Sequence, residues 1–405
     1  QSFDEDNLSK VVHRINAVNR LRSSQFKEDQ GPMAHPVQPK SYLKIDNFYT
    51  LTIYGKGAEV IRMFNLLLGD EAYRAACDEY FSRFDGQAVT IQDFASVMQA
   101  HTELDLSKFF LWYHQAGTPV VKVRGAYDEA AQTYTLTARQ EIPPTAGQAE
   151  TEPMLIPIKV GLIDEQGQEH AAPELYRGEL FLLSEREQSI TISGVTRPVA
   201  PSLFRHFSAP VRLEYDYSDA ELELLMRHDS DGFNRWQAGQ DLSLRELERL
   251  IDLARGSADA MALRGAVSDR YLEVIREVFH DQVEDQYYHA QLLTLPSESY
   301  VAGRMSVINP EAIVAARDAL RWRVADALYS DLCERFSALS GSGASKYEIR
   351  EVGRRALASA CLGLLGALYQ DQDDARCDEV LSLTQSHFDR AFGVNMTDTL
   401  CALNG

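Results

Sequence analysis

The sequence contains few cysteines, and no two of them have the C-x-x-C spacing of redox or metal-binding motifs. The five are Cys77, Cys333, Cys361, Cys377 and Cys401. An odd number of widely separated cysteines in a protein of this size argues against a disulfide framework and against a cysteine zinc site. The composition favours a reducing compartment, and we expect the protein in the cytoplasm.

Basic residues are also scarce, since 40 lysines and arginines stand against 60 acidic residues and give a formal net charge of −20. The electric field of so negative a protein repels phosphate backbones and anionic membrane surfaces. We therefore expect no nucleic-acid partner and no membrane partner. The acidic charge either attracts peptides with a free amino terminus or serves solubility alone.

Long hydrophobic runs are missing too. The longest uncharged helical run, residues 356–369, has 14 residues, fewer than the ~18 that would argue for a membrane span. The acidic residues 1–6 do not resemble a signal peptide. Because Gln1 stands where a complete protein has its initiator methionine, we expect the chain to come from the interior of a longer protein.

Common catalytic motifs are absent from the sequence. None of the ten histidines is followed by glutamate and no two are four residues apart, which excludes the H-E-x-x-H helix of zinc hydrolases. The sequence also has no G-x-S-x-G elbow and no Walker loop. His35 precedes Pro36 in a loop, where a structural role is favoured over metal binding. We predict no metal-binding residues and no complete catalytic site.

The hydrophobic periodicity divides the chain into three zones. Residues 1–117 have helical spacing, interrupted by a polar, proline-containing stretch at 27–40. Thr90 and Asp93 have the spacing of a capping box, Asp70 is expected to be the N-cap of another helix, and Asp105 is expected to open a last short helix. Residues 118–217 alternate as half-buried strands do. Six runs are predicted to form a small β-sandwich: residues 121–124, 133–137, 156–162, 180–183, 189–192 and 211–215.

Residues 218–405 are again helical in their spacing. Asn309 and Pro310 supply an N-cap and an N1 proline for one long helix. Its apolar positions recur every four residues, at Leu320, Val324, Leu328, Leu332 and Phe336. A further helix is predicted over residues 346–369. Successive helices of this kind favour an α-solenoid.

Residues 46–62, with the sequence DNFYTLTIYGKGAEVIR, resemble the tyrosine-bearing segment of the M1 zinc aminopeptidases, and in particular of their bacterial aminopeptidase N group. Further similar runs lie at residues 25–29, 31–36, 66–69, 112–120, 208–213 and 395–398. The resemblance is strong over residues 1–120, fair over the sandwich zone and mainly architectural over the last zone.

The resemblance implies a domain order and a cofactor. Residues 1–117 would be the helical C-terminal half of a thermolysin-like catalytic domain, 118–217 a β-sandwich domain, and 218–405 an incomplete helical domain. In this family two histidines and a glutamate hold zinc, and a second glutamate is the general base. All of them would precede Gln1. The parent enzyme would thus use zinc, and the zinc ligands would be absent from this chain. A missing upstream catalytic segment would then be a partner of this chain.

The resemblance also assigns roles to four residues. Tyr54 matches the transition-state tyrosine, whose neutral phenol can donate a hydrogen bond to the oxygen that becomes negative when hydroxide attacks a peptide carbonyl. Tyr49 matches an aromatic that lines the pocket for the substrate's first side chain. Asp46 and Gly55 lie beside that pocket, where close relatives often have asparagine and glutamate, so side-chain preference stays open. Without the matching flanks, Tyr54 would be interpreted as an ordinary half-buried helix tyrosine.

Three interpretations remain. The chain is part of a zinc aminopeptidase that removes N-terminal residues from peptides in peptide catabolism, or a non-catalytic scaffold or binding protein derived from that fold. In the third, it completes an active site in trans with a separate zinc-bearing chain. The chain alone is expected to have neither zinc nor peptidase activity. Residues 1–117 are expected to be poorly packed or sticky where the missing segment would lie.

Overall fold

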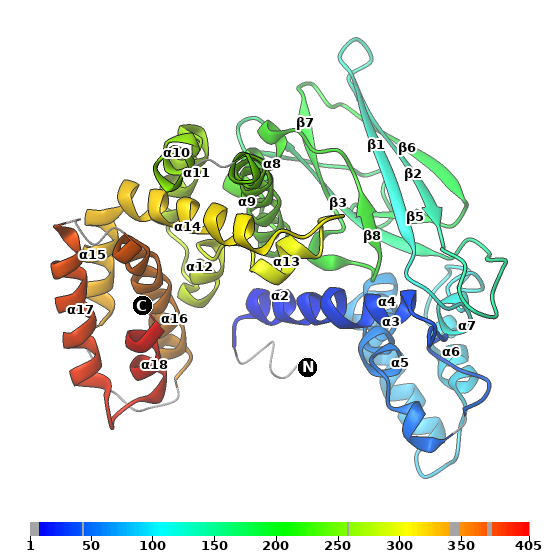
Figure 1. Ribbon diagram of the computed structural model, residues 1–405. Helices are drawn as coiled ribbons and strands as arrows, with labels where there is room; N and C mark the ends of the chain where they lie inside the picture. Colours follow the sequence, from blue (N-terminus) through cyan, green and yellow to red (C-terminus); the bar gives the residue numbers. More distant parts are fainter. Residues whose placement is uncertain (1–7, 43, 257–258, 341–347, 371–374, 405) are drawn as a thin grey trace. The chain divides into compact units, whose positions relative to one another are not determined.

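The computed structural model describes residues 8–42, 44–256, 259–340, 348–370 and 375–404. They form two compact units (Figure 1). One unit holds residues 15–218 and 228–234, and the other holds the residues up to 14, residues 219–227 and the residues from 235 onward. The predicted order of a helical segment, a β-sandwich and a second helical region is confirmed.

Helices come before the first strand. Their bounds are α2 (Lys10–Arg20), η1 (Leu21–Gln25), α3 (Phe26–Gln30), η2 (Ile45–Phe48), η3 (Thr52–Lys56), α4 (Gly57–Leu68), α5 (Asp70–Phe84), α6 (Ile91–Ala100) and α7 (Leu111–His114). Thr90 caps α6 with the predicted capping box to Asp93. Two other expectations are wrong. Gly69 is the N-cap of α5 in place of Asp70, and Asp105 lies in a turn before α7, where its Oδ1 accepts from Ser107 N at 2.9 Å.

A sandwich of two sheets follows. Its strands are β1 (Val120–Asp128), β2 (Thr133–Glu141), β3 (Ile156–Asp164), β4 (Glu169–His170), β5 (Leu180–Leu183), β6 (Glu187–Ser193), β7 (Val199–Leu203) and β8 (Arg212–Glu214). One sheet has the order β6-β2-β1-β8, with β8 parallel to β1. In the other, β3 pairs with β4, β5 and β7. All six predicted runs are strands, whereas β4 and β7 were not predicted.

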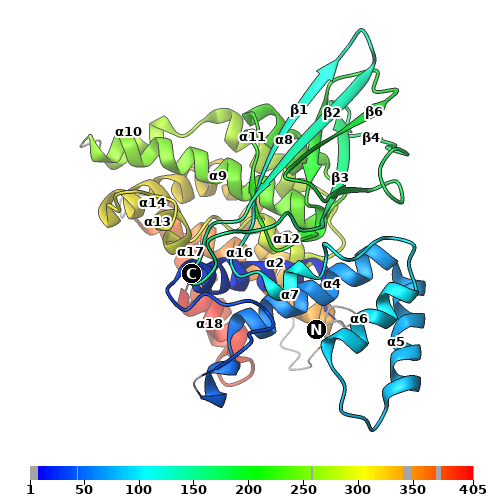
Figure 2. The same ribbon diagram turned by 90° about the vertical axis from the view of Figure 1, so that its right-hand side faces the viewer.

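The first helical segment and the sandwich share one hydrophobic core. Phe64 and Trp112 are fully buried in it together with Val121 and Ile156 of the strands. Trp112 Nε1 also donates to the carbonyl oxygen of Leu155 at 2.9 Å. Figures 1 and 2 show α4 to α7 gathered at one end of the strands. The interior of this segment is therefore closely packed, contrary to the expected poor packing.

Exposed apolar side chains nevertheless occur in the irregular part of this segment and in η3. Each is more than half exposed: Met33, Tyr42, Ile45, Tyr49 and Tyr54. Apolar side chains scattered on a surface are ordinary, but several within a short stretch indicate an interaction site. Phe81 of α5 is a further exposed apolar side chain of this segment, at 65%. The expected stickiness of residues 1–117 stays a prediction.

The second unit is helical. Its elements are α8 (Asp219–His228), α9 (Gly232–Arg255), α10 (Ala260–Ala266), α11 (Asp269–His280), α12 (Gln286–Leu292), α13 (Glu298–Ala302), α14 (Pro310–Ala327), α15 (Tyr329–Leu339), α16 (Ile349–Leu365), η5 (Gly366–Gln370), α17 (Arg376–Ala391) and α18 (Met396–Asn404). The long helix predicted after Asn309 is in fact two, because the chain leaves helical geometry at Leu328 with φ −116° and ψ 15°. Of the helix predicted over 346–369, residues 346 and 347 lie outside the described residues.

A buried charge cluster lies at the edge of the sandwich. Arg205 Nη2 donates to Asp229 Oδ1 at 3.1 Å, and its Nη1 donates to Glu169 Oε1 at 2.6 Å. Ser202 Oγ donates to Asp229 Oδ2 at 2.5 Å. Gly161 leaves room for the guanidinium, because an added Cβ would lie 2.0 Å from Arg205 Cζ. Burial raises the pKa of Asp229 to about 6, although Arg205 acts to lower it.

This raised pKa makes stability depend on pH. The pKa of an unburied aspartate is 3.8, so the folded state binds more protons than the unfolded state between about pH 4 and about pH 6. The stabilisation from protonated Asp229 is complete below about pH 4 and is lost as the pH rises through about 6. Between about pH 4.5 and about pH 7, we expect the free energy of unfolding of the wild-type chain to fall by about 2 kcal/mol more than that of Asp229→Asn. Urea unfolding measures this, and equal pH dependence in both proteins would contradict it.

Candidate active site

Two π-helical turns lie against each other in the first helical segment. The turn η1 links α2 to α3, and η3 leads into α4. A π-turn is rare, and when one occurs within a helix it is often found at a functional site. Gly55 of η3 faces η1, because a Cβ added to it would lie 3.5 Å from Leu21 Cδ2. Gly55 therefore packs against a side chain of η1, at a distance that a Cβ would fill as an ordinary van der Waals contact.

Tyr54 is at the centre of η3. Its side chain is 62% exposed, and its ring stacks on that of Tyr49 with centroids 6.1 Å apart and planes 14° from parallel. Its backbone N–H donates to Thr50 O at 3.2 Å. The phenol therefore reaches solvent from a hydrogen-bonded backbone, beside a second exposed aromatic ring.

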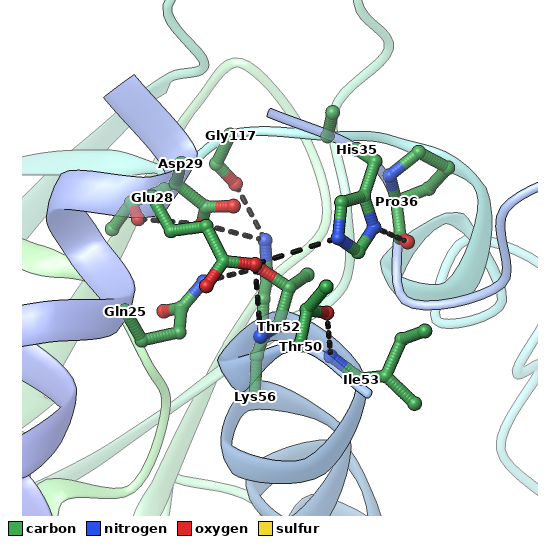
Figure 3. Close-up of polar contacts among 12 residues, drawn as sticks. Gln25, Glu28, Asp29, His35, Pro36, Thr50, Thr52, Ile53, Lys56 and Gly117 are labelled. Carbon is green, nitrogen blue, oxygen red and sulfur yellow. Dashed lines mark hydrogen bonds and ion pairs between the residues drawn. The ribbon is translucent and has the colours of Figure 1, made fainter. Parts of the chain in front are cut away.

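The amino-terminal end of η3 is held by a buried hydroxyl. Thr52 Oγ1 donates to Glu28 Oε1 at 2.9 Å and accepts from Gln25 Nε2 at 3.2 Å. The backbone N–H of Thr52 also donates to Glu28 Oε1, at 3.4 Å. Figure 3 shows these side chains converging from η1, α3 and η3. A side-chain network of this kind fixes the start of η3 against η1 and α3.

The carboxyl-terminal end of η3 is held by a buried ion pair. Lys56 Nζ donates to Asp29 Oδ2 at 3.0 Å and to the carbonyl oxygen of Gly117 at 2.7 Å. Thr118 Oγ1 donates to the same Asp29 oxygen at 2.8 Å. The side chains of Lys56 and Asp29 are 1% and 0% exposed. Charges so completely removed from water persist only when paired and hydrogen-bonded.

His35 borders this network. Its Nδ1 donates to the carbonyl oxygen of Pro36 at 2.8 Å, and its Nε2 lies 3.4 Å from Glu28 Oε1 (Figure 3). The imidazole therefore contacts the carboxylate that holds Thr52. This placement agrees with the structural role that the sequence favoured.

The structure brings some of the four predicted site residues together. Tyr49 and Tyr54 stack on each other. Asp46 lies in η2 with an exposed side chain, and its carbonyl oxygen accepts from Tyr49 N at 3.3 Å. Gly55 faces Leu21 of η1. The roles assigned to these four residues stay predictions.

The anchoring residues were missed, although the sequence held a sign of them. Gln25 and Asp29 are four residues apart, as are Thr52 and Lys56, so each pair can share one side of a helical turn. Polar residues at this spacing beside buried apolar ones indicate a polar contact between two helices. Which two helices meet cannot be derived from spacing alone.

A zinc site requires at least three protein ligands. Within the part of the chain that the structure describes, no group of three or more histidine, cysteine, aspartate or glutamate side chains could hold a metal ion. The described residues therefore do not fit a zinc centre. The same residues include no helix with the length and apolarity needed to cross a membrane.

The sequence matches three protein-family models in succession. Residues 4–113 match the peptidase family M1 domain. Residues 117–216 match DUF3458, a domain of unknown function with an Ig-like fold, and residues 219–405 match DUF3458_C, a domain of unknown function described as ARM repeats.

Curated relatives match the whole chain. Aminopeptidase N of Escherichia coli (strain K12) is 37% identical over 410 residues, which cover 100% of this chain and 45% of that protein. Aminopeptidase N of Caulobacter vibrioides is 40% identical over 403 residues, covering 100% of this chain and 44% of that protein. The chain thus spans less than half the length of these relatives.

A solved structure is similar as well. It is Legionella pneumophila aminopeptidase A in complex with aspartic acid, with a TM-score of 0.76 and 25% identity. The match covers 91% of this chain and 41% of that one. Both kinds of comparison therefore match this chain to a part of proteins named aminopeptidases.

The buried ion pair predicts a stability change. Lys56→Met leaves the Asp29 carboxylate buried without a cation, and removing one partner of a buried pair costs about 3–5 kcal/mol. We expect Lys56→Met to lower the free energy of unfolding by that amount in a urea titration. Lys56→Met combined with Asp29→Asn removes both charges and should lose less than the single variant. A single variant as stable as the wild type would show that the pair is solvated.

Proposed function

Because the chain belongs to peptidase family M1, we propose that it forms part of a zinc metallo-aminopeptidase, which removes N-terminal residues from peptides, and that Tyr54 is a catalytic residue of that enzyme. The observation that carries the proposal is the exposed phenol of Tyr54 on the anchored turn η3. Its place in the M1 segment, residues 4–113, supports it.

The chemistry of amide hydrolysis gives Tyr54 a defined task. When water adds to the peptide carbonyl carbon, the carbonyl oxygen gains negative charge. A phenol O–H aimed at that oxygen donates a hydrogen bond that strengthens as the charge develops, which lowers the barrier. Because η3 is fixed before substrate arrives, the hydroxyl needs little reorganisation during the reaction.

The neighbouring residues complete the proposed substrate site. The ring of Tyr49 stacks on Tyr54 and would form one wall of the pocket for the first side chain. Asp46 adds an exposed carboxylate on η2, which could pair with a cationic group of the peptide. Gly55 has no side chain to reach the substrate, and a Cβ added to it would lie 3.5 Å from Leu21 Cδ2, at ordinary van der Waals distance. We propose that it leaves open a place beside the pocket that a larger side chain would fill. The substrates would be peptides with a free amino terminus.

Zinc would be held outside this chain. The described residues do not fit a zinc centre, so no step of the reaction is assigned to the metal here. We propose that the parent enzyme takes its ligands from an upstream catalytic segment. The five cysteines are free thiols, which supports a reducing compartment such as the cytoplasm. We propose that the parent enzyme acts there in peptide catabolism.

A chimera tests the role of Tyr54. In it, this chain replaces the segment of E. coli aminopeptidase N to which it aligns. We expect the chimera to hydrolyse alanyl anilide, and Tyr54→Phe to lower kcat by about 10²- to 10³-fold with little change in KM, because one oxyanion donor is lost. Tyr42→Phe is the matched control, since it removes the hydroxyl of another exposed tyrosine.

Two results of that assay would count against the proposal. Full activity in Tyr54→Phe would remove this residue from catalysis. A folded, zinc-loaded chimera without turnover would favour the alternative of a non-catalytic scaffold derived from the same fold.

The purified chain gives a separate test. We expect no stoichiometric zinc by metal analysis and no hydrolysis of alanyl or leucyl anilide, because the described residues provide no zinc site. Turnover accompanied by one bound zinc, and abolished in Tyr54→Phe, would show that the chain carries its own ligands.

A further inference from the structure

The turn that carries Tyr54 is anchored at both ends by buried polar side chains. Thr52 is the first residue of η3 and Lys56 the last, and both are buried, whereas Tyr54 between them is exposed. Their partners, Glu28 and Asp29, are adjacent residues of α3. A single short helix thus holds the two ends of the turn.

The two anchors differ in kind. At the first, the hydroxyl of Thr52 lies between two side chains, with Glu28 as acceptor and Gln25 as donor. At the second, the ammonium of Lys56 is bound by a carboxylate and a backbone carbonyl, and charge-assisted bonds of this kind are short and directional. In the part of the chain that the structure describes, the side chains of Thr52 and Lys56 bond to residues other than Tyr54, so both anchors would act through the backbone.

A π-turn needs such anchors more than an α-turn does. It holds one residue more per turn than the α-helix into which it leads, and π-helices are correspondingly rare. Each residue of an α-helix turns the direction of the side chain by about 100°. If η3 relaxed to α-helical geometry, Tyr54 would rotate by about that angle relative to α4 and would leave its stack on Tyr49.

We propose that Thr52 and Lys56, held by Glu28 and Asp29, are positioning residues that keep η3 in its π-helical form and so aim the phenol of Tyr54. This inference rests on the proposed function, because the aim of the phenol matters only if Tyr54 acts on substrate. The anchoring itself is a property of the chain and can be observed without any reaction.

A fluorine label reports the orientation of the Tyr54 ring in this chain alone, without the chimera. Tyr54 is replaced by 3-fluorotyrosine at that position alone, and its ¹⁹F resonance is recorded. Tyr49→Leu removes the stacked ring and supplies the reference shift for an unstacked Tyr54. We expect Thr52→Val, which keeps the shape of threonine but not its hydroxyl, to move the resonance toward that reference or to split it. Thr52→Ser keeps the hydroxyl and should leave the resonance in place.

Lys56→Met tests the second anchor in the same way. Because this variant loses stability, Arg205→Met is its control: it breaks another buried ion pair in the same unit, with Asp229, without touching η3. We expect Lys56→Met to shift the resonance and Arg205→Met to leave it unchanged. If Lys56→Met does not fold, Thr52→Val decides the question. An unchanged resonance in folded Thr52→Val would overturn the proposal.

Kinetics in the chimera separate this inference from the proposed function. We expect Thr52→Val to lower kcat by about 10- to 100-fold with KM changed less than about 2-fold, because a small misplacement of a catalytic group affects the chemical step. Thr52→Ser should restore kcat. A normal kcat in Thr52→Val, while Tyr54→Phe is impaired, would overturn the positioning role alone. A normal kcat in Tyr54→Phe would overturn the proposed function, and the ¹⁹F shift would still decide whether the anchors orient the ring.

Discussion

The ion pair between Lys56 and Asp29 is the contact on which the arrangement of the first unit depends. An ammonium and a carboxylate withdrawn from water stabilise each other, and further hydrogen bonds to the pair offset part of their desolvation. The carbonyl of Gly117 and the hydroxyl of Thr118 supply part of that capacity. Three stretches that are far apart in the sequence must therefore meet at one point. The exposed position of Tyr54 is a consequence of that meeting.

The elements that the sequence predicts well are those with local causes. The capping box of Thr90 and Asp93 requires only four consecutive residues, and strands such as β1 and β2 alternate between buried and more exposed positions along their own length. Where an element depends on tertiary contacts, its prediction from the sequence is wrong or missing. The apolar period continues through Leu328 although the helix breaks there, and β7 contains Pro201 and depends on its pairing with β3.

The candidate site also contains residues that the sequence could predict and residues that it could not. Tyr54 and Tyr49 could be chosen because the residues around them resemble a known family, and the structure adds that their rings stack. The contact of Lys56 with Asp29 could not be predicted, since a lysine and an aspartate 27 residues apart are ordinary surface residues in most proteins. Burial is what gives this pair its importance, and burial is decided by the whole fold.

The position of Gly117 gives the junction before the sandwich a mechanical role. It lies just before β1, with φ +94°, and its carbonyl oxygen accepts from the ammonium at the end of η3. A change in the bend between the helical segment and the sandwich would displace this oxygen and pull on Lys56. The path of the chain at the junction and the last residue of η3 are thus linked by one hydrogen bond. The start of the sandwich therefore forms part of the support of the turn that carries Tyr54.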